Sequence, residues 1–136
     1  MADLVIDVSI SATWCFKDEA TDYTENLLDA VSGSSEATAP TLWAYKIRNS
    51  VLSGVRRKRI TQADADAFLQ SIADLRIILV DPVSYDDIFA LAGRHKLTVY
   101  DASYLDLAIR LQLPLASFDA ELIRAAAQVG VAMFKP

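Results

Sequence analysis

Short apolar runs that end in aspartate recur along this chain, and they constrain its fold more than any other feature. Three such runs end at Asp7, Asp101 and Asp119. If the strands run parallel, their carboxyl ends lie along one edge of the sheet, which is where open α/β folds place their sites. We therefore expect these three side chains to converge. Because crowded carboxylates repel one another, the cluster needs a raised pKa on one member or a cation to hold it. All-oxygen ligand sets favour hard ions such as Mg²⁺ or Mn²⁺.

Short β-branched runs alternate with longer segments of helical periodicity from one end of the chain to the other. This alternation is typical of a parallel α/β sheet with helices on both faces. The run from Ile77 to Val80 is entirely apolar and is followed by Asp81-Pro82, which suits a buried central strand. Five strands are predicted, near Leu4 to Ile6, Ala37 to Ala39, Ile77 to Val80, Leu115 to Ser117 and Val131 to Phe134.

The polar residues at the predicted element ends also have simpler interpretations. Asp101 and Asp119 each precede a helical segment, where an N-cap is worth around 1 kcal/mol. Ser9 could likewise cap a helix or present its hydroxyl to the site. His95, the only histidine, lies at a predicted helix exit and is expected to be a surface cap. The recurrence of aspartate after three apolar runs favours a functional cluster that includes Asp7.

The length and composition indicate one soluble domain. With 136 residues and 53% hydrophobic content, the chain can build one core but not two of ordinary size. It has no apolar run near the ~20 residues of a membrane span, and residues 1–7 lack the order of a signal peptide. We therefore expect a cytoplasmic protein without membrane contact. The single cysteine, Cys15, lies in an apolar run and is expected to be a reduced core residue.

The net charge of −5 disfavours nucleic-acid binding over the whole surface, but it leaves room for a local basic patch. The candidate patch closes a predicted helix and reads Arg56-Arg57-Lys58-Arg59. These cations could complement the helix dipole, or contact phosphates or an acidic partner. A polar stripe that includes Lys46 and Asn49 runs along the same helix and faces either solvent or a cleft.

Three segments of the chain resemble the aspartate-bearing motifs of PIN domains, in particular those of VapC-type toxins. They are Leu4-Val5-Ile6-Asp7-Val8-Ser9, Thr98-Val99-Tyr100-Asp101-Ala102-Ser103-Tyr104 and Leu115-Ala116-Ser117-Phe118-Asp119. Each motif is weak by itself, but their order and spacing together are specific, and the similarity covers the whole chain. The resemblance implies a single PIN-like domain over residues 1–136. It also implies a three-layer fold, in which helices cover both faces of a central, mainly parallel five-stranded sheet.

Members of this family are Mg²⁺- or Mn²⁺-dependent endoribonucleases, commonly dimeric and commonly neutralised by an antitoxin that inserts a segment into the active groove. The resemblance therefore implies RNA as the substrate, a cognate antitoxin as a partner, and a homodimer. It assigns Asp7, Asp101 and Asp119 to the metal cluster. Ser117 matches a position that supports this cluster, and Asn49 matches an asparagine that usually follows the second motif.

One position departs from the family pattern. The second acidic residue of the family is a glutamate in a Glu-x-x-Asn motif, and the aligned stretch here is Lys46-Ile47-Arg48-Asn49. The change reverses the local charge and removes an oxygen ligand. A lysine amine among three aspartates can neutralise part of the cluster and occupy the space of a cation, so metal affinity should fall. Either the chain is a natural member with weakened or lost activity, or the substitution was introduced to disarm a toxin.

Two hypotheses follow from these features. The first is a toxin-type ribonuclease in which metal held by the aspartates activates a water to attack an RNA phosphodiester, while residues 56–59 hold RNA or the antitoxin. The second is a catalytically inactive PIN-fold protein that retains antitoxin or RNA binding and uses Lys46 as a permanent counter-ion. A receiver domain requires an adjacent acidic pair after its first strand, and a haloacid-dehalogenase-type phosphatase requires Asp-x-Asp. The stretch Asp7-Val8-Ser9 offers neither.

Overall fold

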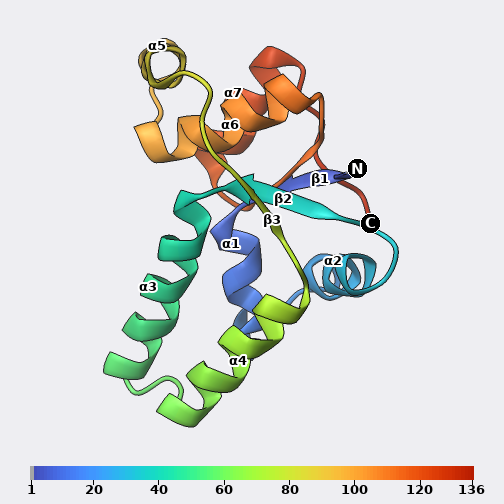
Figure 1. Cartoon of the computed structure of the whole chain (residues 1–136), viewed down its shortest axis with the longest axis vertical. Helices are drawn as coiled ribbons and strands as arrows, with labels where there is room; N and C mark the ends of the chain where they lie inside the picture. Colours follow the sequence, from blue (N-terminus) through green and yellow to red (C-terminus); the bar gives the residue numbers. More distant parts are fainter. Residues whose placement is uncertain (1) are drawn as a thin grey trace.

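A parallel sheet of four short strands forms the centre of the molecule (Figure 1). The computed structural model describes residues 2–136, so Met1, the first residue of the expected domain, lies outside the described residues. The strand order is β3-β2-β1-β4, and each neighbouring pair is parallel. The strands are β1 (Leu4–Ile6), β2 (Ala37–Pro40), β3 (Ile78–Val80) and β4 (Leu115–Ala116). The expected parallel α/β architecture is therefore confirmed.

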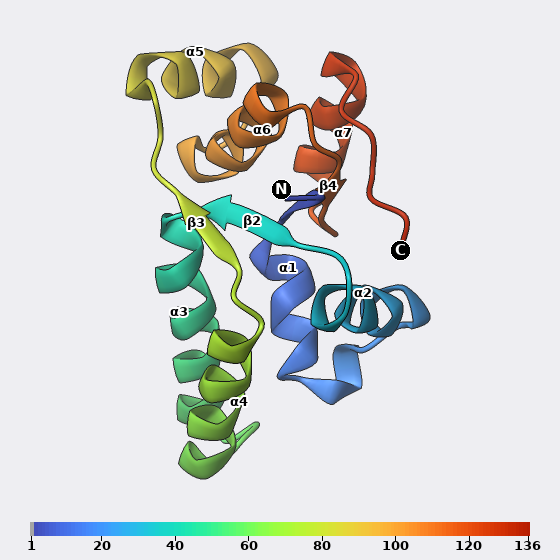
Figure 2. The same cartoon turned by 45° about the vertical axis from the view of Figure 1, so that its right-hand side comes forward.

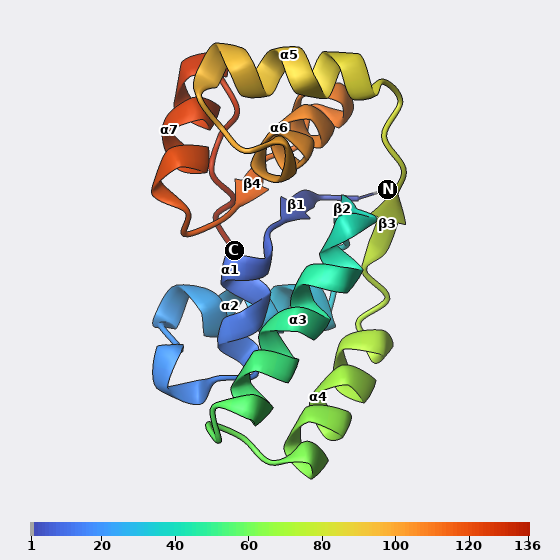
Figure 3. The ribbon, with the colours of Figure 1, turned by 90° about the vertical axis from the view of Figure 1, so that its left-hand side faces the viewer.

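Helices cover both faces of the sheet, which gives three layers (Figures 2 and 3). One layer contains α1 (Val8–Ser11), α2 (Asp22–Ser32), α3 (Leu42–Arg56) and α4 (Gln62–Asp74), with two 3₁₀ turns at Ala12–Trp14 and Lys17–Glu19. The other layer contains α5 (Tyr85–His95), α6 (Val99–Leu111) and α7 (Ala120–Val129). In the described part of the chain, no helix is both long enough and apolar enough to cross a membrane.

The predicted fifth strand, Val131 to Phe134, is wrong. This segment makes only an isolated parallel bridge, in which Met133 pairs with Leu115. The reason lies in β4, which has two residues before the chain leaves the sheet at Ser117 and turns toward α7. Because β4 offers so little backbone, the last segment cannot build a longer ladder beside it.

The expected central position of Ile77 to Val80 is also wrong. In the structure β3 is an edge strand whose one neighbour is β2. Ile78 and Leu79 are 41% and 40% exposed. An apolar run shows that a segment favours burial, but it does not say which strands lie beside it. The strands that are buried along their whole length are β1, β2 and β4, and α6 packs against β1 and β2.

Polar residues at the helix starts set where the functional elements begin. The hydroxyls of Thr61, Ser84 and Thr98 each accept a backbone N–H three residues on, which satisfies a donor that the helix leaves unpaired. Thr61 is therefore the N-cap of α4. Thr98 fixes the start of α6, and so determines how Asp101 is presented at the carboxyl edge of the sheet.

Candidate active site

The pairing of β1 with β4 brings two of the predicted site segments together. Ile6 pairs with Ala116, and the backbone N–H of Asp7 donates a 3.0 Å hydrogen bond to the carbonyl of Ala116. The residues that follow each strand must then leave the sheet at the same edge. Asp7 and Ser117 consequently lie side by side at the carboxyl edge of the sheet.

Two hydroxyl groups hold the carboxylate of Asp7, which is 7% exposed. Ser9 and Ser117 donate hydrogen bonds of 2.7 Å and 2.9 Å to the same atom, Oδ2. The Ser9 hydroxyl also accepts the N–H of Phe118 at 2.9 Å, and the Ser117 hydroxyl accepts the N–H of Asp119 at 3.0 Å. The alternative of Ser9 as a helix cap is therefore wrong, because its hydroxyl contacts Asp7 and the loop after β4. The other carboxylate oxygen of Asp7 takes part in neither of these bonds.

Asp101 and Asp119 reach the same edge from two helix starts. Asp101 is not the N-cap of α6, since Thr98 has that role and accepts the Asp101 N–H at 3.0 Å. Asp119 does cap α7, because its Oδ1 accepts the N–H of Leu122 at 3.0 Å. The capping alternative is thus wrong for Asp101 and right for Asp119, whose Oδ2 is not used by this cap.

The carboxylates influence one another electrostatically. Burial raises the pKa of Asp101, and the negative charges of Asp119 and Asp7 raise it further. Lys46 and the Thr98 hydroxyl act in the opposite direction. A carboxyl group responds in this way when like charges lie close by and water is partly excluded. The charges of Asp7 and Asp119 thus act on Asp101, which is consistent with the expected convergence, while the assignment of the three aspartates as one metal cluster stays a prediction.

Tyr104 is a further residue of this region, and it is 1% exposed. Its hydroxyl is buried and has no hydrogen-bond partner among residues 2–136. Burial raises the pKa of the Tyr104 hydroxyl, and the charges of Asp7 and Asp101 raise it further. The spacing of three residues from Asp101 is one helical turn, which is the sequence signal that could have identified it. An unpaired buried hydroxyl beside two carboxylates offers a hydrogen bond to a ligand or an ordered water.

The residues present fit a hydrated divalent ion better than a closed metal cage. Their donors are all oxygens, as Mg²⁺ and Mn²⁺ prefer. However, within residues 2–136 no group of three or more His, Cys, Asp or Glu side chains is arranged to hold an ion. Mg²⁺ commonly keeps several waters and uses only one or two protein carboxylates. The free oxygens of Asp7 and Asp119, together with Asp101, could supply such ligands.

Lys46 lies close enough to Asp101 to act on it electrostatically, and its ammonium packs against an aromatic ring. Its Nζ lies 5.0 Å from the centroid of the Tyr100 ring, over the ring face. In the described part of the chain, Lys46 forms no ion pair with an aspartate. Its charge nevertheless acts on the cluster, because it lowers the pKa of Asp101. Lys46 therefore adds positive charge near Asp101 without an ion pair to an aspartate among residues 2–136.

Asn49 and part of the basic run line a hollow to which none of the three aspartates contributes. Asn49 is exposed one turn after Lys46, where it lines a hollow together with Arg57. Arg59 is already engaged: it pairs with Asp18 at 3.0 Å and Glu19 at 2.8 Å, and its guanidinium lies 4.2 Å from the Phe16 ring centroid. No such ion pair involves Arg56, Arg57 or Lys58 within residues 2–136. These three cations remain available to an outside partner.

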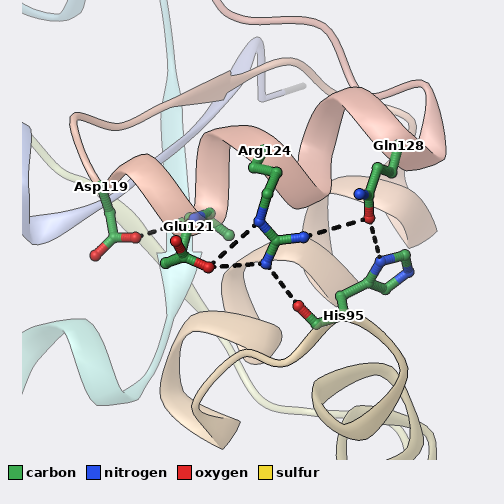
Figure 4. A network of polar contacts seen from close by, with 6 residues as sticks. His95, Asp119, Glu121, Arg124 and Gln128 are labelled. Atoms are coloured by element: carbon green, nitrogen blue, oxygen red, sulfur yellow. Dashed lines mark hydrogen bonds and ion pairs between the residues drawn. The ribbon is translucent and has the colours of Figure 1, made fainter.

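A polar network ties α7 to the turn that precedes α6 (Figure 4). Arg124 donates a 2.7 Å hydrogen bond to the carbonyl of His95 and a 2.9 Å bond to Glu121. The His95 ring Nδ1 lies 2.9 Å from Oε1 of Gln128. His95 lies in the last turn of α5, as expected, and it is half-buried because its ring contacts Gln128 of α7. The network links the helix that starts at Asp119 to the segment that leads into α6.

Comparisons with known proteins agree with this architecture. A family model described as PIN domain matches residues 4–128. Ribonuclease VapC3 of Pyrobaculum aerophilum is 30% identical over 122 residues, a match that covers 88% of this chain and 91% of the relative.

Solved structures with the same fold come from three organisms. PAE2754 from Pyrobaculum aerophilum has a TM-score of 0.74 at 22% identity, covering 91% of this chain and 84% of that one. VapC20 of Mycobacterium tuberculosis, a toxin that cleaves the sarcin-ricin loop, has a TM-score of 0.71 at 13% identity, covering 98% and 100%. FitAcB from Neisseria gonorrhoeae has a TM-score of 0.66 at 18% identity, covering 98% and 97%. Because the family model spans most of the chain and the curated relative matches over most of both sequences, this chain belongs to the PIN domain family and is of the VapC type.

Proposed function

We propose that this protein is a metal-dependent endoribonuclease of toxin type, with activity reduced by Lys46. The observation that carries the proposal is the link from Asp7 through the Ser117 hydroxyl to Asp119, together with the effect of both charges, which raise the pKa of Asp101. Such a cluster is stable when a cation offsets the repulsion. Its oxygen donors favour Mg²⁺ or Mn²⁺ over softer metals.

The residues around the aspartates would prepare them for this role. Ser9 and Ser117 hold one oxygen of Asp7 and leave the other directed away from these bonds. The cap bond to Leu122 orients Asp119 in the same way. A bound divalent ion supplies an activated water and offsets charge on the phosphodiester that is attacked. Fixed ligand orientation matters because displaced ligands bind the ion and the substrate less well.

The relatives support RNA as the substrate. Ribonuclease VapC3 is named for this activity, and VapC20 cleaves the sarcin-ricin loop. Arg56, Arg57 and Lys58 lie at the end of α3, the helix that carries Lys46, and they would contact RNA phosphates or a cognate antitoxin. Arg59 is held by Asp18 and Glu19 and would hold the end of α3 in place.

A catalytically inactive PIN-fold protein that keeps antitoxin or RNA binding is the second candidate. The specific observation in its favour is Lys46, a cation where the family has an acidic ligand. Lys46 lowers the pKa of Asp101, so it stabilises the ionised cluster in the absence of metal. A protein of this kind would show a thermal stability that does not respond to Mn²⁺.

The test compares three forms of residue 46. Mn²⁺ binding is measured by calorimetry for the chain as it stands, for Lys46→Glu and for Lys46→Gln, and RNA cleavage is assayed in parallel. We expect Lys46→Glu to bind Mn²⁺ and cleave RNA. Lys46→Gln removes the positive charge without adding a carboxylate. It therefore separates the effect of removing the repulsion between Lys46 and Mn²⁺ from the effect of adding a metal ligand. Adding Asp7→Asn to Lys46→Glu should abolish cleavage. If Lys46→Glu neither binds metal nor cleaves, the inactive binding protein is the better description.

We also propose a cytoplasmic homodimer that binds an antitoxin. Support for self-association comes from α5 and the segment before it, where Val83, Tyr85 and Phe89 are 72–77% exposed. Tyr85 also lines an apolar hollow of about 240 Å³ against α6. Exposed apolar patches of this kind mark interaction surfaces. Light scattering on wild type and Phe89→Glu tests the dimer, since the charge should produce a monomer.

A further inference from the structure

We propose that Lys46 and Tyr100 together form a contact for single-stranded RNA, in which Lys46 binds a backbone phosphate and the Tyr100 ring stacks on a nucleobase. This inference rests on the proposed function, because it names how the substrate is held at the same site. It assigns Lys46 a positive role in binding rather than only the loss of a metal ligand.

The pair bridges the two helical layers at the carboxyl edge of the sheet. Lys46 comes from α3 and Tyr100 from the first turn of α6, which lie on opposite sides of the sheet (Figures 1 and 3). Their 5.0 Å separation therefore reflects tertiary structure rather than proximity in sequence. Asp101 is the next residue after Tyr100, so a strand of RNA held by this pair would pass directly beside the carboxylates.

Both side chains are accessible to a ligand. Lys46 is exposed and forms no ion pair within the part of the chain that the structure describes, so its ammonium keeps three donors for an oxyanion. Tyr100 is 60% exposed, although it lies beside a half-buried carboxylate. An exposed cation–π contact is weak, so a phosphate can draw the ammonium off the ring. The ring face would then be free for a base.

The charge of the site explains why Lys46 should matter for RNA. Three aspartates converge here, and they repel an incoming phosphate unless a cation intervenes. Lys46 is the cation that acts on Asp101. In the absence of divalent metal, phosphate binding at this edge therefore depends on Lys46. The combination of a cation and an exposed aromatic face is the general arrangement by which proteins hold single strands without sequence preference.

The test measures binding without cleavage. A fluorescent single-stranded RNA with 2′-O-methyl groups is titrated in EDTA over a range of NaCl concentrations, and anisotropy reports the dissociation constant. The full-length chain is compared with Lys46→Met, Lys46→Arg, Tyr100→Phe and Tyr100→Leu. Arg76→Met is the charge control, because Arg76 is exposed and precedes β3 at the opposite, amino edge of the sheet.

We expect Lys46→Met to weaken binding roughly fivefold at low salt and to reduce the slope of log K against log salt by about 0.7, as for one lost phosphate contact. Tyr100→Leu should weaken binding about fivefold or more with little change in slope, since stacking is not a charge interaction. We expect dissociation constants within about twofold of wild type for Lys46→Arg, Tyr100→Phe and Arg76→Met. Arg76→Met should show only the small change in salt slope that the loss of a surface charge produces.

Two results would overturn the inference. If wild type binds RNA and Lys46→Met binds equally well with the same slope, Lys46 is a counter-ion for Asp101 and no phosphate contact exists, while the proposed function stands. If wild type does not bind and Lys46→Glu does not cleave, the proposed function fails and this inference fails with it. Circular dichroism of each variant excludes unfolding as the cause of lost binding.

Discussion

The hydroxyl of Ser117 donates a 2.9 Å hydrogen bond to Asp7, which follows a different strand. The same oxygen accepts the backbone N–H of Asp119 at 3.0 Å. Ser117 is 3% exposed, so water cannot readily replace either bond. One buried hydroxyl therefore holds the carboxylate of Asp7 and the backbone of Asp119, and it does so because the chain leaves β4 immediately after Ala116.

Ser117→Ala should loosen both aspartates. In the Lys46→Glu background we expect Mn²⁺ affinity to fall about 10- to 100-fold, as when other groups that orient metal ligands are removed. The free energy of unfolding should fall by about 1 to 3 kcal/mol, because the Asp7 carboxylate loses a buried donor. Calorimetry and urea denaturation measure the two quantities. Ser103→Ala is the control, since the Ser103 hydroxyl bonds a carbonyl of its own helix. Unchanged Mn²⁺ affinity in a destabilised Ser117→Ala protein would contradict a role in orienting ligands.

Two helical glycines should respond to alanine in opposite directions. A methyl group on Gly54 would lie 2.5 Å from Cε1 of Phe16, whose ring is buried and also contacts Arg59. Overpacking commonly costs more than the ~1 kcal/mol that helix propensity returns, so Gly54→Ala should destabilise by about 1 kcal/mol net. Gly93 has open space around it, so Gly93→Ala should stabilise by up to about 1 kcal/mol. Urea denaturation measures the free energy of unfolding of both variants. A stabilised Gly54→Ala protein would show that the Phe16 ring moves freely.

Cys15 should react slowly with thiol reagents near neutral pH. Burial raises the pKa of the Cys15 thiol, Asp64 raises it further, and Arg59 opposes both. The thiolate is the reactive form, so its rate of modification should rise at higher pH than for a free cysteine. Removing the charge with Asp64→Asn should shift this profile to lower pH, and Arg59→Met should shift it to higher pH. Stopped-flow measurements with a disulfide reagent give the profiles. If the pH dependence of the Cys15 modification rate is the same in wild type and in both variants, the electrostatic explanation is contradicted.

Local sequence patterns predicted the site residues whose positions depend on a strand end or a helix start. Asp7 follows a buried parallel strand, and Asp119 caps the helix after the next strand in the sheet, so strand and helix signals together placed them at one edge. The cap at Thr61 was predictable for the same reason, since it requires only residues three apart. The position of Asp101 was inferred from the apolar run that ends there, but this run is not a strand: Val99 and Tyr100 begin α6, and both are exposed.

Features that depend on tertiary packing were not predictable. The apolar run of β3 could not show that this strand lies at the sheet edge, and the length of β4 decided whether Val131 to Phe134 could pair. The position of Lys46 over Tyr100 depends on how two helices from opposite layers approach each other. Tyr104 is buried, and its hydroxyl, which has no partner among residues 2–136, comes close to the aspartates only because α6 packs on the sheet.

Arg124 should hold α7 in the position that the site requires. Its guanidinium bonds the His95 carbonyl at 2.7 Å and Glu121 at 2.9 Å, so it joins α7 to the turn before α6 (Figure 4). We expect Arg124→Met to lower the free energy of unfolding by about 1 kcal/mol, a modest value because the pair is partly exposed.

The same substitution should speed amide exchange at Leu122, whose N–H is bonded to Asp119. Arg124→Lys should behave much like Arg124→Met in both stability and amide exchange, because an ammonium cannot reproduce the forked donor geometry of a guanidinium. Arg94→Met, at an exposed position next to His95, is the matched control and should leave exchange unchanged. Hydrogen exchange followed by mass spectrometry measures the first turn of α7 directly. If exchange there is equally slow in Arg124→Met, the Asp119 cap and the β4 connection hold the helix start without help from the network.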